Sequence, residues 1–180
     1  MDYDQLIKNW HAKALEEDYF SKFVFEYLAF IAILKKKKFT NASTDRSAIQ
    51  QLKRDNSTNH LYTQSIQDRQ ELKQAWEGIK MELDAIPLAN ETGPGEEFEL
   101  TKWWNCSSDS PNHPQGERSS RQRGTIHSLD DWENMVEIWY SIRNNLFHGA
   151  KDPNDGRDQL LVENGYKTLH SLIEILLSEQ

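Results

Sequence analysis

The chain has 180 residues, 37% of them hydrophobic and 28% charged, which is the size and composition of a folded domain with its own core. Its formal net charge of −8 argues against broad, non-specific binding to nucleic acid, so any phosphate-binding site must be a local basic pocket. The single cysteine excludes an intramolecular disulfide. We expect one domain over residues 1–180.

No pattern in the sequence directs the chain into or across a membrane. The first residues, Met-Asp-Tyr-Asp-Gln, are acidic and polar and lack the basic and then apolar regions of a signal peptide. The most apolar run, Phe23–Leu34, is interrupted by Glu26 and is shorter than the about 20 residues that a membrane helix needs. We therefore expect a cytoplasmic protein with a buried core helix at this position.

Helical spacing of apolar residues predicts a first helical segment over 3–38, with a break near 18–21 where Ser21 is a candidate cap. Lys35–Lys38 close this segment, and we interpret them as a solvated helix end rather than a surface for RNA. Further helices are predicted over 44–54, 64–85, 129–148 and 157–177. The polar string 55–60 breaks the chain between two of them, and Pro87 ends another. The pattern predicts an all-α bundle of four to six helices.

Residues 86–128 show no helical period and form a long irregular insertion before the helix 129–148. Alternating apolar and polar residues over 98–102 favour a short hairpin there. The insertion also carries Arg121 and Arg123, which are candidates to bind phosphate.

The helix 129–148 is the clearest of the predicted helices and ends in a cluster of polar residues. Ser128 is a candidate N-cap, and Gly149 stands where a C′ glycine belongs. The helix closes with the string Arg143-Asn144-Asn145-Leu146-Phe147-His148. An arginine matches the oxygens of a phosphate with a fixed fork of donors, and a histidine transfers protons near neutral pH. Asn144 and Asn145 add neutral groups for a ribose or phosphate oxygen.

The spacing of Arg143 and His148 does not make them a self-contained pair. Five residues separate them by about 140° around an ideal helix, so they do not meet as neighbours one turn apart would. A groove lined by several groups suits this geometry better than a direct contact. A plain surface arginine with a histidine favoured by the helix dipole is the competing interpretation.

The string from Arg143 to His148 resembles the R-x4-6-H motif of the HEPN superfamily, including the polar residue that often follows the arginine. The neighbourhood is also similar, because the motif ends the penultimate helix and a last helix opens at Arg157. The likeness covers about 139–162, with a looser one at 20–30.

This resemblance implies a helical bundle that dimerises, so that two copies of the motif share one cleft. It further implies a metal-independent endoribonuclease of a defence, toxin–antitoxin or stress system, whose products carry 2′,3′-cyclic phosphate and 5′-hydroxyl ends. Arg143 and His148 would be catalytic and Asn144 supporting, with Asn145, Lys151, Arg121 and Arg123 as substrate contacts. The alternative is a HEPN-type module that binds nucleotide, or a nucleotidyltransferase partner such as an antitoxin, without cleavage. An interaction protein whose insertion is the functional part is a third interpretation.

The sequence offers no ligand spacing typical of a metal site. Cys106 and His113 have no second pair of ligands for zinc. The loop 152–156 does not match a calcium loop, because Lys151 and Pro153 fall where its first acidic ligands belong. We expect neither a metal nor a cofactor.

Overall fold

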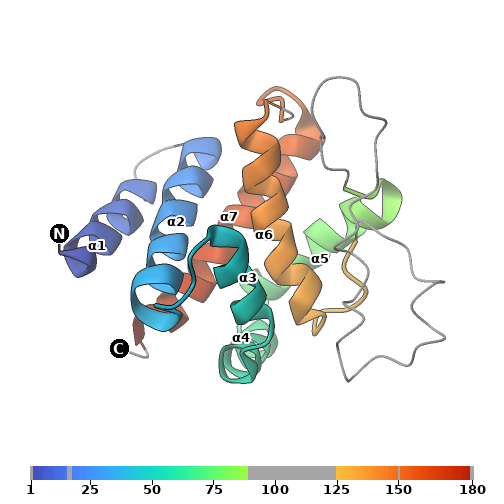
Figure 1. Cartoon of the computed structure of the whole chain (residues 1–180). Coiled ribbons are helices and arrows are strands. Elements are labelled where there is room, and N and C mark those ends of the chain that lie inside the picture. The colour runs from blue at the N-terminus through green and yellow to red at the C-terminus, as the bar shows by residue number, and fades with distance from the viewer. Residues whose placement is uncertain (1, 16–17, 89–124, 150, 179–180) are drawn as a thin grey trace.

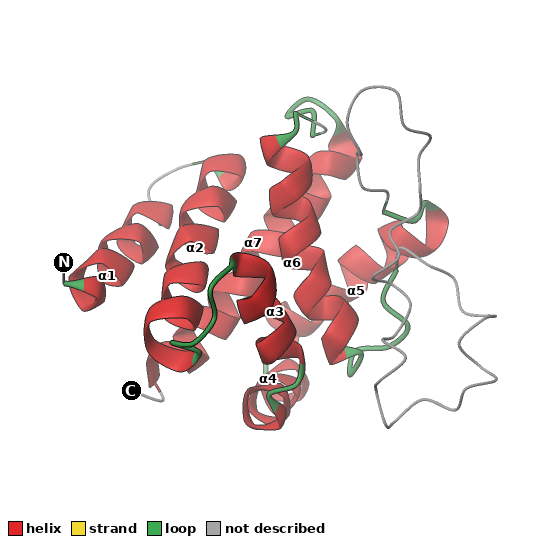
Figure 2. Cartoon of the chain, viewed as in Figure 1, coloured by secondary structure: helices red, strands yellow, loops and turns green. Residues whose placement is uncertain are grey.

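The structure is a computed structural model that describes residues 2–15, 18–88, 125–149 and 151–178. These residues form seven α-helices and one π-helical segment and contain no strand (Figures 1 and 2). The elements are α1 (Tyr3–Ala14), α2 (Tyr19–Ile33), η1 (Leu34–Lys38), α3 (Asp45–Lys53), α4 (Asn56–Asp68), α5 (Gln70–Ala85), α6 (Trp132–Phe147) and α7 (Gly156–Ser178). The predicted all-α class is confirmed. No helix in the described ranges is both long enough and apolar enough to cross a membrane.

The described residues hold more helices than the four to six predicted, because two predictions about the middle of the chain were wrong. The polar string 55–60 starts a helix instead of breaking one. Asp55 is the N-cap of α4, where its carboxylate accepts hydrogen bonds from the Ser57 amide at 3.2 Å and the Thr58 hydroxyl at 2.7 Å. The predicted helix 64–85 is divided at Arg69, whose extended backbone separates α4 from α5.

Three lysines of η1 form ion pairs with other helices, whereas the sequence predicted a solvated helix end. Lys35 pairs with Asp45 and Lys38 with Asp55, each at 3.0 Å, and Lys37 pairs with Asp4. The partners lie in α1, in α3 and at the cap of α4. The lysine run therefore joins the start of three helices rather than presenting a free basic surface.

Buried aromatic side chains fix α6 against α4, α5 and α7. The indole N–H of Trp139 donates to Thr168 Oγ1 at 3.0 Å, and the indole N–H of Trp76 donates to the Tyr62 hydroxyl at 2.9 Å. That hydroxyl in turn donates to the carbonyl of Thr168 at 2.7 Å. The rings of Tyr62, Trp76 and Trp139 contact one another with centroids 5.6–6.5 Å apart. Each polar edge is satisfied, so this core holds α6 in a defined position.

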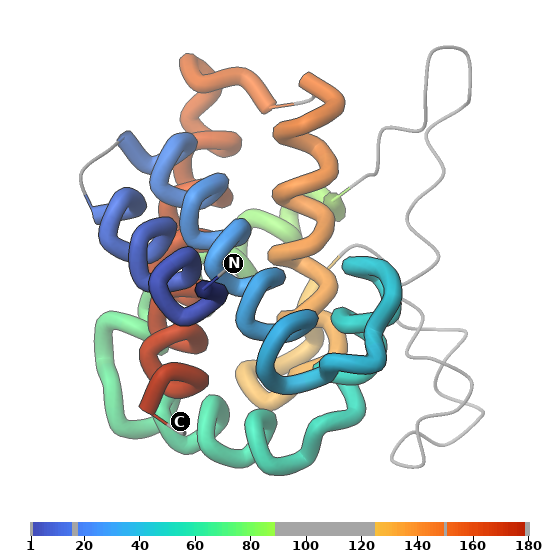
Figure 3. Tube along the Cα trace, turned by 60° about the vertical axis from the view of Figure 1, so that its left-hand side comes forward, coloured from blue at the N-terminus to red at the C-terminus, as the bar shows by residue number. Residues whose placement is uncertain are grey.

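Helix α7 packs against both α2 and α5, while α1 lies on the outer side of α2 (Figures 1 and 3). At Gly165 of α7, an added Cβ would lie 2.8 Å from Ile142 Cδ1 and 3.3 Å from Phe23 Cε2. The missing side chain therefore lets α7 approach α6 and α2 closely. Both views place the start of α2 and the end of α6 at the same end of the bundle.

The two ends of the predicted insertion are held beside α5. Leu88 and Ile126 are buried, and the Thr125 hydroxyl donates to Asp84 Oδ1 at 2.9 Å. The hairpin predicted over 98–102 lies outside the described residues. Helix α6 begins at Trp132, later than the predicted Leu129, because Asp131 rather than Ser128 occupies the N-cap position.

Candidate functional site

The polar residues predicted to carry chemistry lie at the C-terminal end of α6. His148 is the C-cap residue, and its backbone N–H donates to the carbonyl of Asn144 at 2.9 Å. Gly149 follows with a φ of +73°, a conformation that favours glycine, so the predicted C′ position is confirmed. The imidazole of His148 is exposed where the chain turns away from the helix. It is therefore accessible to a ligand.

Arg143 is half-buried and held in place by its own helix. Its Nη1 donates to Asn144 Oδ1 at 2.9 Å, and its guanidinium lies 4.6 Å from the centre of the Phe147 ring and 5.9 Å from that of Tyr27. These contacts orient the cation without neutralising it, because no carboxylate within the described ranges forms an ion pair with it. The remaining donors of the guanidinium can bind an anion.

Arg143 and His148 do not hydrogen-bond to each other in the described part of the chain. This result agrees with the spacing argument. Asn144 connects them indirectly, since its side chain accepts from Arg143 and its carbonyl accepts from His148.

Two of the predicted substrate contacts are concealed in the single chain. Asn145 is buried in the face of α6 that packs on the bundle. The Lys151 side chain is only 4% exposed and pairs with Asp158, and the amide of Asp152 also donates to Asp158, at 2.9 Å. Lys151 therefore holds the turn between α6 and α7 in this structure. Arg121 and Arg123 lie outside the described residues.

An apolar groove lies beside the motif, at the same end of the bundle. It has a volume of about 300 Å³ and is lined mainly by hydrophobic side chains of α2 and α6: Phe20, Ser21, Val24, Phe25, Leu146 and Phe147. The Phe147 side chain is 59% exposed, so it adds an uncovered aromatic ring to the edge of this groove. Such a surface favours contact with another protein chain.

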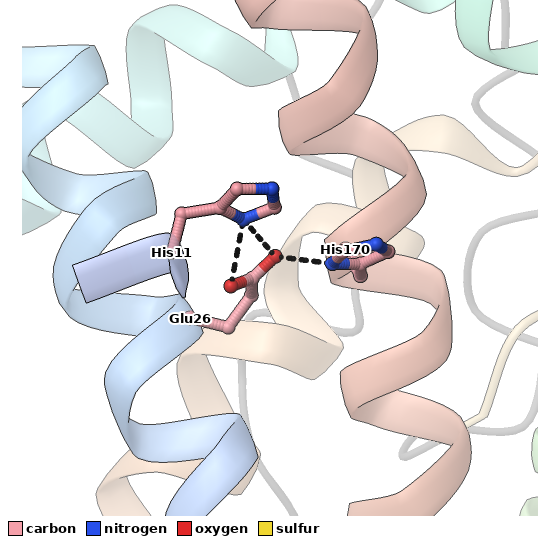
Figure 4. Close-up of side chains that lie close together, drawn as sticks. All are labelled: His11, Glu26 and His170. Atoms are coloured by element: carbon pink, nitrogen blue, oxygen red, sulfur yellow. Dashed lines mark hydrogen bonds and ion pairs between the residues drawn. The ribbon is translucent and has the colours of Figure 1, made fainter. Parts of the chain in front are cut away.

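A second cluster, formed by His11, Glu26 and His170, was not identified from the sequence. Figure 4 shows the Glu26 carboxylate between the two imidazoles, which come from α1 and α7. Nδ1 of His11 lies 2.9 Å and 3.1 Å from the two Glu26 oxygens, and Nδ1 of His170 lies 2.8 Å from Oε1. Glu26 is fully buried, while the histidine side chains are 21% and 22% exposed. The cluster therefore links three helices through one buried carboxylate.

The electrostatics of the cluster keep the glutamate ionised. Burial on its own would raise the pKa of Glu26, but hydrogen bonds from His11 and His170 outweigh it, and the pKa lies below its ordinary value. The hydrogen bond to Glu26 raises the pKa of His11 despite its partial burial. The buried carboxylate thus stays ionised through the hydrogen bonds that it accepts from two histidines.

Glu26 was the one sign of this cluster in the sequence, as the charged residue within the apolar run Phe23–Leu34. Its partners lie 15 residues before it and 144 residues after it, so no local spacing joins them. Only the packing of α1 and α7 on either side of α2 brings the three residues together.

Comparison of the chain with models of protein families, with curated proteins and with solved structures finds no match. The resemblance to the HEPN superfamily accordingly rests on the residues at the end of α6 and their neighbours.

Proposed function

We propose that the chain is a metal-independent endoribonuclease whose active site is formed by Arg143, Asn144 and His148. The observation that carries the proposal is the accessible cation and imidazole at the end of α6, both free of any carboxylate partner among the described residues, with Asn144 orienting the guanidinium. An arginine with unused donors beside an exposed histidine is a suitable arrangement for phosphate chemistry.

In the proposed reaction the 2′-hydroxyl of a ribose attacks the adjacent phosphorus atom. The bond from phosphorus to the 5′-oxygen breaks, which leaves a 2′,3′-cyclic phosphate and a 5′-hydroxyl. Arg143 holds the phosphate and stabilises its added negative charge. Protonated His148 transfers a proton to the leaving 5′-oxygen, and the proton released from the 2′-hydroxyl passes to solvent water, from which the histidine is protonated again. Asn144 positions Arg143 through the hydrogen bond that it accepts.

The active enzyme in this proposal is a homodimer. Arg143 and His148 of one chain lie too far around the helix to enclose a phosphate, and the apolar groove beside them exposes Phe147. A second copy packed over this groove around a twofold axis brings two motifs into one cleft and buries the exposed ring. Although the chain carries a net charge of −8, the cleft of the proposed dimer would then hold the basic groups of two motifs at the place where RNA binds.

The cleavage test uses end-labelled RNA with the purified chain in EDTA. Wild type is expected to leave cyclic phosphate and 5′-hydroxyl ends. His148→Ala is expected to lower the rate by about 10²–10⁴-fold, and Arg143→Ala by about 10²–10³-fold. His60→Ala, at an exposed histidine of α4, is the matched control and should retain full activity.

Cleavage that survives both substitutions removes this site, and cleavage abolished by EDTA in a chain that stays folded refutes the metal-free reaction. An inactive wild type that binds nucleotide, or a nucleotidyltransferase partner, supports the non-catalytic alternative instead. The dimer is tested by light scattering with Phe147→Asp. Wild type should have the mass of two chains and the variant that of one, and a monomeric wild type at micromolar concentration contradicts the shared cleft.

A further inference from the structure

We propose that His11, Glu26 and His170 form a binding site for a divalent transition-metal ion, with Zn²⁺ as the ion that fits best. The three residues are the group among the described residues in which histidine and carboxylate ligand atoms converge, all within 4.8 Å of one another. This site is separate from the proposed active site and does not depend on the chain being a ribonuclease.

The ligand types and their separation suit zinc. Two imidazole nitrogens and one carboxylate oxygen are a known zinc set, with bonds of about 2.0–2.2 Å and a fourth position open to water. Tetrahedral geometry at those bond lengths separates ligand atoms by about 3.3 Å. The nitrogen–oxygen distances of 2.9 Å and 2.8 Å are shorter by about half an ångström. The two imidazoles are stacked, with centroids 4.9 Å apart and planes 16° apart, so an ion bound by both would turn one ring out of the stack.

A further carboxylate lies where a metal-bound histidine commonly has one. Nε2 of His170, the nitrogen that faces away from Glu26, lies 3.7 Å from Glu174 Oε1. Glu174 is itself paired with Arg69 at 2.9 Å. A carboxylate on the outer nitrogen fixes the tautomer of a ligating histidine and increases its basicity.

The partners of Glu26 differ in kind from those of the other buried glutamate among the described residues. Glu137 of α6 is fully buried and pairs with Arg46 at 2.6 Å and with Lys53 at 2.9 Å, both from α3. Permanent cations therefore serve for charge neutralisation in this core. Around Glu26 the partners are instead two histidines, whose ring nitrogens, unlike the cations of lysine and arginine, can bind a metal ion.

The site is also open to an ion from solvent. Both histidines are about one-fifth exposed, and His170 lines a surface pocket of about 510 Å³ together with Tyr166 and Asn164. Of the three proposed ligands, His170 therefore borders solvent-filled space on this side. A bound ion would clamp α1 onto α2 and α7.

The test measures Zn²⁺ binding to the metal-free full chain by calorimetry and by metal analysis after dialysis. We expect one ion per chain and a rise in Tm on loading. His11→Gln and His170→Gln keep a hydrogen-bond donor for Glu26 but are poor zinc ligands, and each should weaken binding at least about 100-fold. Glu174→Gln should weaken it about tenfold.

The controls separate this site from other histidines and from the proposed activity. His60→Ala and His148→Ala should bind Zn²⁺ as wild type does. Co²⁺ in place of Zn²⁺ should give the visible absorption of a tetrahedral ion, and lose it in His170→Gln. Circular dichroism checks that each variant is folded, and the two glutamine variants stand as independent tests if one is not.

Two results overturn the proposal: no binding by wild type at micromolar Zn²⁺, or equal binding by wild type and both glutamine variants. Wild-type RNA cleavage in a chain that binds no zinc would reject only this site. Loss of cleavage in His148→Ala with zinc binding intact would support the two proposals independently.

Discussion

Among the residues that the structure describes, two glutamates, Glu26 and Glu137, are fully buried, and their charges are balanced by different partners. Glu137 lies between an arginine and a lysine of α3, whose charges persist at any physiological pH. Glu26 lies between histidines of α1 and α7, whose ring nitrogens can also bind a metal ion. The first arrangement can only be an ion-pair network, whereas the second can exchange protons or a metal for its hydrogen bonds.

This difference indicates where the bundle is fixed and where it can respond to its surroundings. Helix α3 is bound to α6 through the charged network at Glu137, beside the aromatic core. Helix α1 packs mainly on α2 and reaches α7 through the histidine cluster. Substitutions at Glu137 and at Glu26 should therefore differ in their effect on the free energy of unfolding.

Glu137→Gln is expected to cause the largest loss of stability. It leaves Lys53, whose side chain is 5% exposed, and Arg46 without their shared carboxylate. Removing one partner of a buried ion pair typically costs about 3–5 kcal/mol. We expect a loss at the lower end of this range, because Lys53 keeps Glu133 at 4.0 Å and the Arg46 side chain is 39% exposed. Urea unfolding followed by circular dichroism measures the change in the free energy of unfolding.

The double variant Glu137→Gln with Lys53→Met is the control for this interpretation. It removes one of the stranded charges and should recover a large part of the loss. A loss for Glu137→Gln alone of less than about 1 kcal/mol would mean that Lys53 and Arg46 reach solvent easily.

Glu26→Gln is expected to cost less, about 1–2 kcal/mol in the absence of metal, although its side chain is buried as completely. The histidines can become neutral, and the glutamine amide can accept from one ring and donate to the other. The same urea experiment compares the two glutamate variants. Equal losses at the two sites would show that titratable partners offer no relief and would remove the contrast.

The sequence was informative where a function or an element depends on neighbouring residues. The helix that carries Arg143 and His148, its glycine at position 149 and the all-α class follow from spacing along one stretch of chain. The same reasoning failed at Asp55, where polar residues that resemble a loop act as a helix cap. A cap and a turn have similar compositions, so composition alone does not separate them.

Contacts between distant segments could not be predicted. His11, Glu26 and His170 come from three helices, and nothing in their spacing indicates that they meet. The pairing of Lys151, a predicted substrate contact, with Asp158 of α7 was likewise not indicated by its place beside the motif. In both cases the answer depends on how helices pack, which a single sequence does not specify.

Asp131 provides an intermediate case, a carboxylate that pairs with one histidine along the chain. Burial would raise its pKa, but hydrogen bonds from His127 and Asn134 outweigh it and keep the pKa below the usual 3.8. A depressed pKa stabilises the fold above the ordinary value, and that contribution is lost as the pH falls through the pKa of the folded state. Acidification should therefore weaken the start of α6.

Asp131→Asn should cost about 0.5–1 kcal/mol near pH 6, less than Glu26→Gln, and the difference from wild type should shrink as the pH approaches about 2. Unfolding free energies at several pH values test this expectation. A difference that grows on acidification would contradict the assigned direction of the pKa.

His148→Ala is expected to have the smallest effect on stability, within about 0.5 kcal/mol, because the imidazole is exposed and the backbone cap to Asn144 does not need the side chain. The same substitution is expected to have the largest effect on RNA cleavage. Substitution of a residue that the fold requires lowers the free energy of unfolding, as we expect for Glu137→Gln. A residue at the open end of α6 that is dispensable for folding but indispensable for cleavage must contribute through its chemistry. Measuring both quantities on one preparation decides the point, and a stability loss in His148→Ala comparable to that of Glu137→Gln would mean that His148 supports the fold instead.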